Sequence, residues 1–241
     1  MRLTFLGTGA AFAPDAFNAS YVLDRHILID AGSPVHVLIP RAGESVRDID
    51  TVVITHTHGD HTFGLPFFLS ARAIDHPDAS PLTIVGPPGF ATYIEQLFDL
   101  AWGARLRNMV MERLQPQVHE VDGGDTVDLP SLRVHAERMV HVPDIPCLGY
   151  AMSSGATRFA FSGDCEPCAG LDAVVEVADH VLVEMTGPLG GAHGHMTREA
   201  VEALIARNPG KRFYLTHLNS REPVAGAILG EDLASVELEP L

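Results

Sequence analysis

The amino-acid sequence predicts an α/β protein of four layers, an αββα sandwich in which two β-sheets lie face to face and helices cover both outer surfaces. Short apolar segments bounded by glycine or proline recur along both halves of the chain, as strands do. Several are followed by segments with apolar residues at helical spacing. The 241 residues, 46% of them hydrophobic, are enough for a substantial core. We expect a single domain over residues 1–241, since no linker, low-complexity tract or tandem repeat interrupts the chain.

The first half of the chain supplies one sheet and its helices. Strands are expected at residues 3–6, 20–23, 26–30 and 52–54, where apolar side chains lie between turn residues. A helix is expected over residues 62–73. Another is expected over residues 90–102, in which Phe90, Ile94 and Leu97 recur at helical spacing.

The second half repeats this order. Strands are expected at residues 132–140, 148–152, 157–161, 180–184 and 213–217, and the second and third of these form a hairpin. A helix is expected over residues 197–207, because Thr197 can cap its first turn and Pro209-Gly210 ends it.

A cluster of metal-ligand side chains follows the strand at residues 52–54. It reads His56-Thr57-His58-Gly59-Asp60-His61. Alternate residues of an extended chain face the same way, so His56 and His58 can hold one cation. After the turn at Gly59, Asp60 and His61 can face a second cation. Imidazole and carboxylate are ligands that zinc and similar divalent metals prefer, so the cluster predicts a metal site.

Three further ligand types each stand at the end of an expected strand. His141 follows residues 132–140, Asp164 follows residues 157–161 and a glycine turn, and His217 ends residues 213–217. Taken singly, each is more typical of a core or capping residue. Together with the first cluster they repeat one pattern, strand then ligand then turn, at four places.

These motifs resemble the metallo-β-lactamase superfamily, and more narrowly its ribonuclease Z and phosphodiesterase branch. The order His56-x-His58-x-Asp60-His61, His141, Asp164, His217 carries the resemblance. Supporting segments are Phe5-Leu6-Gly7-Thr8-Gly9-Ala10, Leu28-Ile29-Asp30-Ala31-Gly32, Val85-Gly86-Pro87-Pro88-Gly89 and Leu148-Gly149-Tyr150. The His-x-His-x-Asp-His motif is specific for the superfamily and not for one reaction.

The resemblance implies a dinuclear site and a hydrolytic mechanism. It places His56, His58 and His141 on the first metal, Asp60, His61 and His217 on the second, and Asp164 between them. Two divalent ions are implied, zinc in the first place, with manganese or iron as alternatives. Such a pair lowers the pKa of a shared water, so that a metal-bridging hydroxide becomes the nucleophile. Asp60 is expected to orient it.

Two more residues match the ribonuclease Z branch. Glu184 corresponds to the glutamate of its His-Glu-Ala-Thr motif, although Val183 stands where that motif has histidine. His195 corresponds to the histidine that lies beside the scissile phosphate. We therefore expect Asp60, His195 and Glu184 to be the catalytic residues, with Glu184 holding the His195 imidazole in its charged form to stabilise the transition state or protonate a leaving oxygen.

A small substrate is favoured over a large RNA. Members that process transfer RNA carry a long arm between the third histidine and the bridging aspartate, whereas only 22 residues separate His141 from Asp164, enough for one hairpin. The net charge is −15 and Lys211 is the only lysine, whereas polyanion binding relies on basic side chains. The expected function is hydrolysis of a small phosphodiester, such as a cyclic nucleotide, a cyclic phosphate or a short nucleotide.

Two other function classes remain open. The same site can hydrolyse a carbonyl substrate, as a lactonase, a thioesterase or a weak β-lactamase. A non-enzymatic binding module is disfavoured, because relatives that abandon catalysis commonly lose ligands, and all seven ligand positions are present here.

The remaining features bear on the pocket and on the setting of the protein. The loop before Asn18 and the segment 187–192 can border the pocket, and Phe63, Phe67, Phe68 and Trp102 can shape it or pack in the core. No segment resembles a signal peptide or a membrane span, and three cysteines cannot all pair, so a cytoplasmic location is expected. Cys165 and Cys168 are expected to be packing residues. Relatives that are dimers make a homodimer compatible with the sequence.

Overall fold

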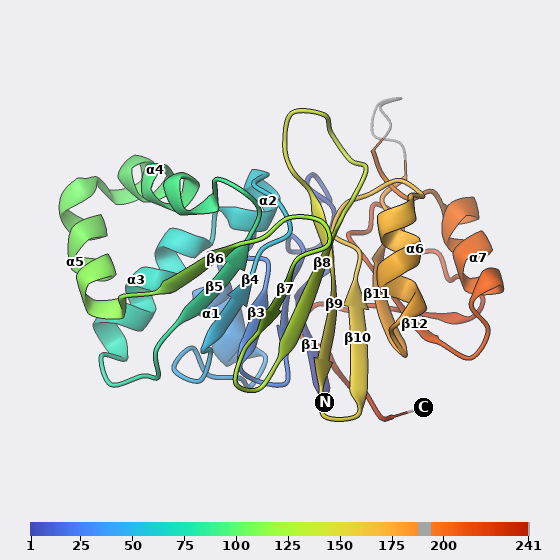
Figure 1. The fold of residues 1–241 in the computed structure, drawn as a ribbon, viewed down its shortest axis with the longest axis horizontal. Coiled ribbons are helices and arrows are strands. Elements are labelled where there is room, and N and C mark those ends of the chain that lie inside the picture. The colour runs from blue at the N-terminus through green and yellow to red at the C-terminus, as the bar shows by residue number, and fades with distance from the viewer. Residues whose placement is uncertain (188–193, 241) are drawn as a thin grey trace.

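The computed structural model describes residues 1–187 and 194–240, and within these ranges two mixed β-sheets are covered by helices (Figure 1). The first sheet has the strand order β14-β1-β2-β3-β4-β5-β6. Its strands are β1 (Arg2–Gly7), β2 (Ser20–Leu23), β3 (Ile27–Ile29), β4 (Thr51–Val53), β5 (Thr83–Gly86), β6 (Gln117–Glu120) and β14 (Ser235–Glu237).

The second sheet has the order β13-β12-β11-β10-β9-β8-β7. Its strands are β7 (Thr126–Asp128), β8 (Arg133–Arg138), β9 (Leu148–Ser154), β10 (Thr157–Phe161), β11 (His180–Glu184), β12 (Arg212–Thr216) and β13 (Ala227–Leu229). In both sheets the pairings change from parallel to antiparallel after four strands, at β3 in the first and at β10 in the second. The two halves therefore share one strand plan.

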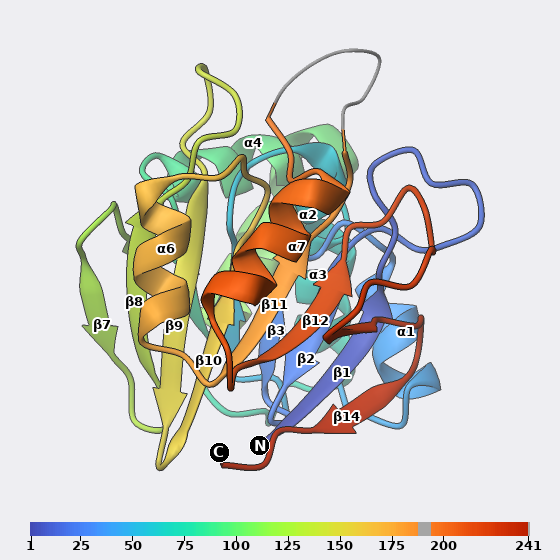
Figure 2. The same cartoon turned by 90° about the vertical axis from the view of Figure 1, so that its right-hand side faces the viewer.

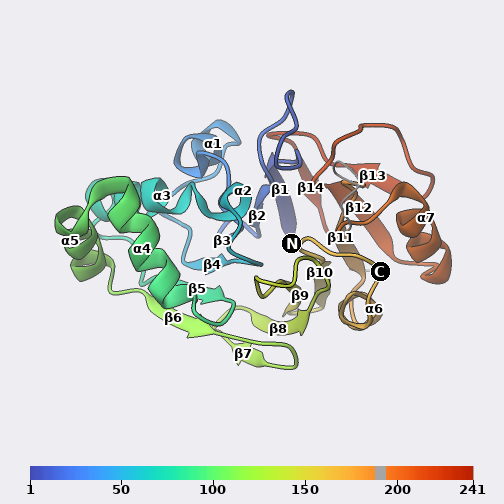
Figure 3. The same cartoon turned by 90° about the horizontal axis from the view of Figure 1, so that it is seen from above.

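Helices cover the outer face of each sheet, as Figure 3 shows from above. The first sheet carries α1 (Val35–Arg41), α2 (Gly59–Thr62), α3 (Leu65–Asp75), α4 (Phe90–Trp102) and α5 (Ala104–Leu114). The second carries α6 (Ala169–Glu176) and α7 (Arg198–Arg207), which lie in front of it in Figure 2. The predicted αββα sandwich is confirmed.

Three apolar clusters hold the layers together. One lies between the sheets and includes Phe5, Tyr21 and Phe159, all buried. The other two lie between each sheet and its helices. Two tyrosines also join the sheets by hydrogen bonds, since the Tyr150 hydroxyl donates to the carbonyl of Ile54 at 2.7 Å and the Tyr21 hydroxyl contacts Thr216. Burial of this apolar surface is the main stabilising contribution.

The predicted helix over residues 62–73 is wrong at its start. The structure has the short helix α2, then a break at Phe63 and Gly64, then α3. Gly64 lies against the carbonyl oxygens of Ala31 and Ser33, so closely that a Cβ atom there would collide with both. This contact with the chain after β3 breaks the helix, and it positions the ligand-bearing turn.

Among the described residues, no helix is long and apolar enough to cross a membrane.

Candidate metal centre

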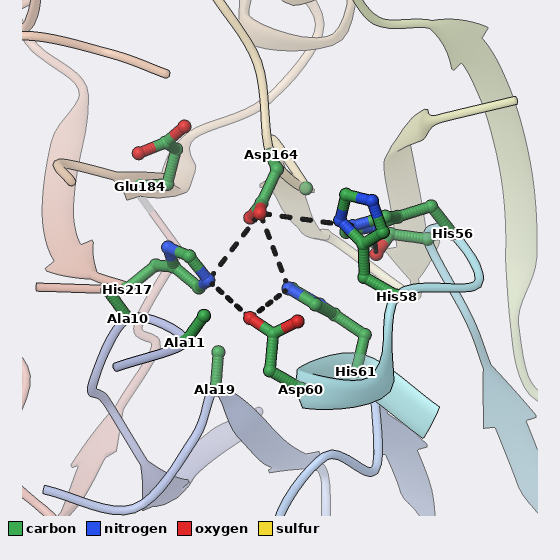
Figure 4. Close-up of polar contacts among 12 residues, drawn as sticks. Ala10, Ala11, Ala19, His56, His58, Asp60, His61, Asp164, Glu184 and His217 are labelled. Carbon is green, nitrogen blue, oxygen red and sulfur yellow. Dashed lines mark hydrogen bonds and ion pairs between the residues drawn. The ribbon is translucent and has the colours of Figure 1, made fainter. Parts of the chain in front are cut away.

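The seven predicted ligand residues lie together at one edge of the two sheets. They follow the carboxyl ends of β4, β8, β10 and β12, so four distant segments contribute. Figure 4 shows Asp164 in the middle of the set, with His217 on one side and His56 and His58 on the other. The side chains form two overlapping groups, each able to hold one metal ion: His56, His58, His141 and Asp164, and then Asp60, His61, Asp164 and His217.

In the first group three imidazole nitrogens meet. The His58 Nδ1 atom lies 3.0 Å from His56 Nε2 and 3.3 Å from His141 Nε2. The Asp164 Oδ2 atom lies 3.9 Å from both Nε2 atoms. Four atoms that can bind a metal ion therefore surround one small space.

The second group shares the same carboxylate oxygen. Asp164 Oδ2 lies 3.4 Å from His61 Nε2 and 3.5 Å from His217 Nε2, and Asp60 Oδ2 lies 3.5 Å and 3.2 Å from the same two atoms. Because a single Asp164 oxygen faces both groups, this carboxylate has the position of a bridge between two ions.

The donor chemistry fits divalent metal ions. The buried His61 Nε2 atom has no hydrogen-bond partner in the described part of the chain, and buried polar atoms are rarely left without one. In the first group, nitrogen atoms of three imidazoles face one another, an arrangement that a cation between them stabilises. Imidazole and carboxylate ligands with this geometry are typical of zinc and related metals.

The electrostatics favour the ligand forms of His56, His58 and Asp164. At His61, by contrast, burial opposes protonation, but the carboxylates of Asp164 and Asp30 outweigh it and raise the pKa. Burial, followed by the nearby charge of His61, lowers the pKa of His56 well below its ordinary value, and burial and His141 lower that of His58. Burial alone opposes ionisation of Asp164, but the neighbouring His217 and His61 hold its pKa well below the usual range. Neutral imidazole and ionised carboxylate are the forms that bind a metal.

Hydrogen bonds from neighbouring residues orient four of the imidazoles. Each contacts the ring nitrogen that faces away from the centre, which fixes the tautomer and the ring plane. The pairs are His61 Nδ1 with Asp30 Oδ2 at 2.7 Å, His56 Nδ1 with Thr55 Oγ1 at 3.0 Å, His141 Nδ1 with the Gly194 carbonyl at 2.7 Å, and His217 Nδ1 with Thr186 Oγ1.

Asp30 is the main functional residue that sequence reasoning left without a role. Its carboxylate is fully buried, accepts hydrogen bonds from the Thr55 amide and hydroxyl, and accepts one from His61. The residue follows β3 with φ of 51°, and His217 follows β12 with the same φ. A non-glycine residue in the left-handed region is strained and is frequent at functional sites. The signal was present, since Asp30 also shows the pattern of strand then carboxylate.

Glu184 and His195 lie together beside the ligand groups, as the sequence predicted. The His195 Nδ1 atom donates to Glu184 Oε1 at 2.8 Å, and the His195 ring lies 5.5 Å from that of His217. Burial opposes protonation of His195, but the hydrogen bond and the charge of Glu184 outweigh it and raise the pKa of the ring.

The Glu184 carboxylate is buried and does not face the pocket. Besides His195, it accepts hydrogen bonds from the backbone N–H groups of Cys165, Thr186 and Met196. Its contacts are those of a residue that positions the parts of the site around it.

A cavity of about 580 Å³ opens above the ligand groups. Five of the proposed ligands and His195 line it, and the remaining lining residues are Ala11, Phe12, Asn18, Gly32, Gly59, Phe63 and Val142. Of the aromatic residues considered earlier, Phe63 lies in the wall, Phe68 is buried in the core, and Phe67 packs against Trp102 outside the cavity. The proposed border segment 187–192 lies, apart from Gly187, outside the described residues.

The cysteines take no part in either ligand group within the described residues. Cys147 and Cys165 are buried, and the Cys168 thiol lies 3.7 Å from the sulfur of Met139. These contacts agree with a packing role.

Comparison with known proteins places this site in a family. Residues 1–223 match the family described as anti-Pycsar protein Apyc1. Ribonuclease Z of Bacillus licheniformis is 25% identical over an alignment of 283 residues in length. This alignment covers 92% of this chain and 89% of that protein. The metal-dependent hydrolase class that the motifs predicted is shared by these relatives.

Solved structures agree. Human tRNase Z, short form, superposes with a TM-score of 0.80 and 26% identity over 99% of this chain and 100% of that chain. Zn²⁺-bound PqqB of Methylobacterium extorquens shares the fold, with a TM-score of 0.74 and 17% identity over 99% of this chain and 100% of that one. The chain is a metal-dependent hydrolase of the ribonuclease Z-like branch of the metallo-β-lactamase superfamily, and within that branch it belongs to the family of anti-Pycsar protein Apyc1.

Proposed function

We propose that the protein is a phosphodiesterase that hydrolyses a small phosphodiester, with a cyclic nucleotide as the first candidate. The observation that carries this proposal is the pair His195–Glu184 beside a two-metal ligand set on the floor of one cavity. An imidazole held by a buried carboxylate next to metal ligands suits protonation of a leaving oxygen. Membership of the anti-Pycsar protein Apyc1 family supports the choice of a cyclic nucleotide as the first candidate.

The residues that would hold the metals are those of the two groups. His56, His58 and His141 would bind one ion, Asp60, His61 and His217 the other, and Asp164 both. We propose zinc, with manganese or iron as alternatives. When bound, two such ions lower the pKa of water and neutralise charge on a phosphoryl oxygen.

The chain's own side chains then orient the substrate and move protons. His195 directs Nδ1 to Glu184, so its other nitrogen, Nε2, is available to a ligand. In the proposed reaction a water oxygen bonds to phosphorus and that water loses one proton to solvent. The bond from phosphorus to the sugar oxygen breaks, and His195 gives its proton to that oxygen and then regains one from solvent. The Asp60 side chain is 15% exposed, and its carboxylate accepts a hydrogen bond from the attacking water and aligns it. The product is a phosphomonoester.

A large RNA is not the proposed substrate. The interval between His141 and Asp164 holds only the hairpin of β9 and β10. Among the described residues, no lysine or arginine lines the cavity. With a net charge of −15, the molecule repels a long polyanion at distances beyond the metal centre.

Parallel assays with different classes of substrate test the proposal. Purified protein with its metal content counted would be assayed with cyclic mononucleotides and bis(p-nitrophenyl) phosphate, and in parallel with a lactone and a thioester. We expect diester hydrolysis that falls by about 100-fold or more in His195→Ala, with two metals still bound. Rapid lactone or thioester turnover with negligible diester hydrolysis would replace the phosphodiesterase by the carbonyl hydrolase.

A further inference from the structure

Two large exposed aromatic side chains line the cavity that also contains His195. Phe12 is 83% exposed and Phe63 is 62% exposed, and both line the cavity above the ligand groups. A single exposed apolar residue is ordinary on a protein surface, whereas two that border the same functional cavity indicate a binding surface.

Phe63 is held in place by the ligand-bearing turn itself. Its amide donates to the Gly59 carbonyl at 2.9 Å, and its ring packs on the Gly59 backbone. A Cβ atom built at Gly59 would lie 2.6 Å from two carbons of that ring. The absence of a side chain at Gly59 therefore lets the aromatic ring lie against the backbone of the ligand-bearing turn, at the residue between His58 and Asp60.

Phe12 stands in a loop whose backbone is tied to its own base. The Gly9 amide donates to the Phe17 carbonyl at 2.8 Å, and the Asn18 side chain donates to the Ala11 carbonyl at 3.2 Å. The loop thus presents an aromatic side chain to solvent from a hydrogen-bonded support. An exposed aromatic ring on such a support loses little conformational entropy when a flat ligand covers it.

The charges of the cavity define the rest of the ligand. Its described lining has histidines and aspartates at the floor, apolar side chains at the walls, and neither lysine nor arginine. One anionic group can be met at the floor, but a second phosphate has no cationic side chain to pair with.

From these contacts we infer that Phe12 and Phe63 bind the nucleobase of the substrate by stacking, while its single phosphodiester charge lies at the floor. The inference rests on the proposed phosphodiesterase function and names the part of the substrate that the walls recognise. Stacking on aromatic rings tolerates different bases, because every base has a π-face.

Kinetics with and without a base test this inference. The substrates are adenosine 3′,5′-cyclic monophosphate and methyl riboside 3,5-cyclic phosphate, which has the same diester and no base. In Phe12→Ala and Phe63→Ala we expect KM for the nucleotide to rise about tenfold with kcat nearly unchanged. Kinetic constants for the baseless substrate should stay as in the wild type. Phe63→Leu, which keeps an apolar side chain but no ring, should behave as Phe63→Ala does.

Phe67→Ala is the matched control. Phe67 is 43% exposed on the neighbouring helix α3, but it lies outside the cavity and stacks on His36 at 5.5 Å. It should change neither substrate's constants. Equal losses for both substrates in the Phe12 and Phe63 variants, or an unchanged KM for the nucleotide, would overturn the role of the two rings.

A binding measurement separates this inference from the proposed function. If the wild type hydrolysed neither cyclic phosphate, the phosphodiesterase proposal would fail. Calorimetric titration of the metal-loaded wild type and variants with the cyclic nucleotide would still decide the role of the rings. A Kd about tenfold weaker in each variant than in the wild type supports the base-binding role. The role is contradicted if the variants keep the wild-type Kd, or if the wild type shows no detectable binding.

Discussion

At the scale of single residues, the site depends on carboxylates that never need to touch a substrate. Glu184 accepts N–H groups from Cys165, Thr186, His195 and Met196. Through these contacts it holds the segment after Asp164, the threonine behind His217 and the histidine proposed as the acid. One buried carboxylate therefore aligns three functional side chains at once.

We predict that Glu184→Gln lowers kcat by about 100-fold and leaves KM and metal content nearly unchanged. The amide keeps the size of the side chain but sets a donor against one of four N–H groups, which should also destabilise the fold by about 2 kcal/mol. Steady-state kinetics and metal analysis provide the check. Glu120→Gln is the control, because Glu120 accepts two backbone N–H groups at the exposed start of α4 and should leave activity intact. Wild-type kcat in Glu184→Gln would contradict the positioning role.

Asp30 offers a second residue-scale prediction. The variant Asp30→Asn should bind metal about 10- to 100-fold more weakly, because the partner that orients His61 loses its charge. A competition titration with a chromophoric chelator measures this affinity. Asp50→Asn removes a carboxylate from another histidine pair, that with His26, and should leave metal affinity as it is. Equal affinities in the two variants would refute the assignment.

At the scale of elements, the break between α2 and α3 determines where the ligand turn lies. Gly64→Ala would push a methyl group into the carbonyls of Ala31 and Ser33, so we expect a loss of about 3 kcal/mol in the free energy of unfolding. Urea denaturation measures it. Gly43→Ala provides a comparison, since Gly43 has φ of 80° and open space around it, and should cost only about 1 kcal/mol. Similar losses in both variants would mean that the contact at Gly64 does not constrain the break.

The residues directly before β3 and β4 form a pair whose contribution to the stability of the fold depends on pH. The His26 Nδ1 atom lies 3.0 Å from Asp50 Oδ1, and this hydrogen bond raises the pKa of His26. Burial opposes ionisation of Asp50, but the bonds from His26 and Thr51 prevail and lower its pKa. A raised histidine pKa stabilises the fold below the unfolded value of about 6.5, and this contribution is lost as pH rises. A lowered aspartate pKa stabilises the fold above the unfolded pKa of about 3.9, and that contribution is lost as pH falls.

The pair should therefore stabilise the protein most between about pH 4 and 6.5. We predict that His26→Gln loses up to about 1 kcal/mol in this window and less at pH 8, a small value because both side chains are partly exposed. Denaturant midpoints at several pH values test it. In the Asp50→Asn background the same substitution should show no such pH dependence, and a constant difference from pH 5 to 8 would exclude the pair as its source.

At the scale of the whole molecule, the metal centre joins the two sheets. His56 follows β4 of the first sheet, whereas Asp164 and His217 follow β10 and β12 of the second. An ion held by both sheets binds the folded state only, and such binding shifts the folding equilibrium.

Removal of metal should lower Tm by about 10 °C, which corresponds to about 4 kcal/mol for ligand at 1,000 times its Kd in a chain of this size. Thermal melts with and without a chelator, followed by zinc addition, measure the effect and its reversal. A His56→Ala/Asp164→Ala variant should no longer respond to the chelator. An unchanged Tm after chelation of protein that had carried two ions would contradict this coupling.

The sequence by itself determined the fold class, and it singled out the seven proposed ligand residues and the pair Glu184–His195, which the structure brings together. Strand and helix periodicities are local, and the ligands stand directly after apolar strands, so their pattern is visible in a few residues. The strands at residues 20–23 and 180–184 and the helix at 90–102 were predicted with their observed bounds for the same reason.

Only the tertiary structure decided which distant groups meet. The contacts of Asp30 with His61, of Glu184 with Cys165 and of β14 with β1 join residues far apart in the chain, and no local pattern encodes such pairs. The break at Gly64 arises from a carbonyl of another segment, and the cavity walls at Phe12 and Phe63 arise from two separate loops. Packing between segments overrides local propensity at these places, because steric and hydrogen-bonding constraints act through space and not along the sequence.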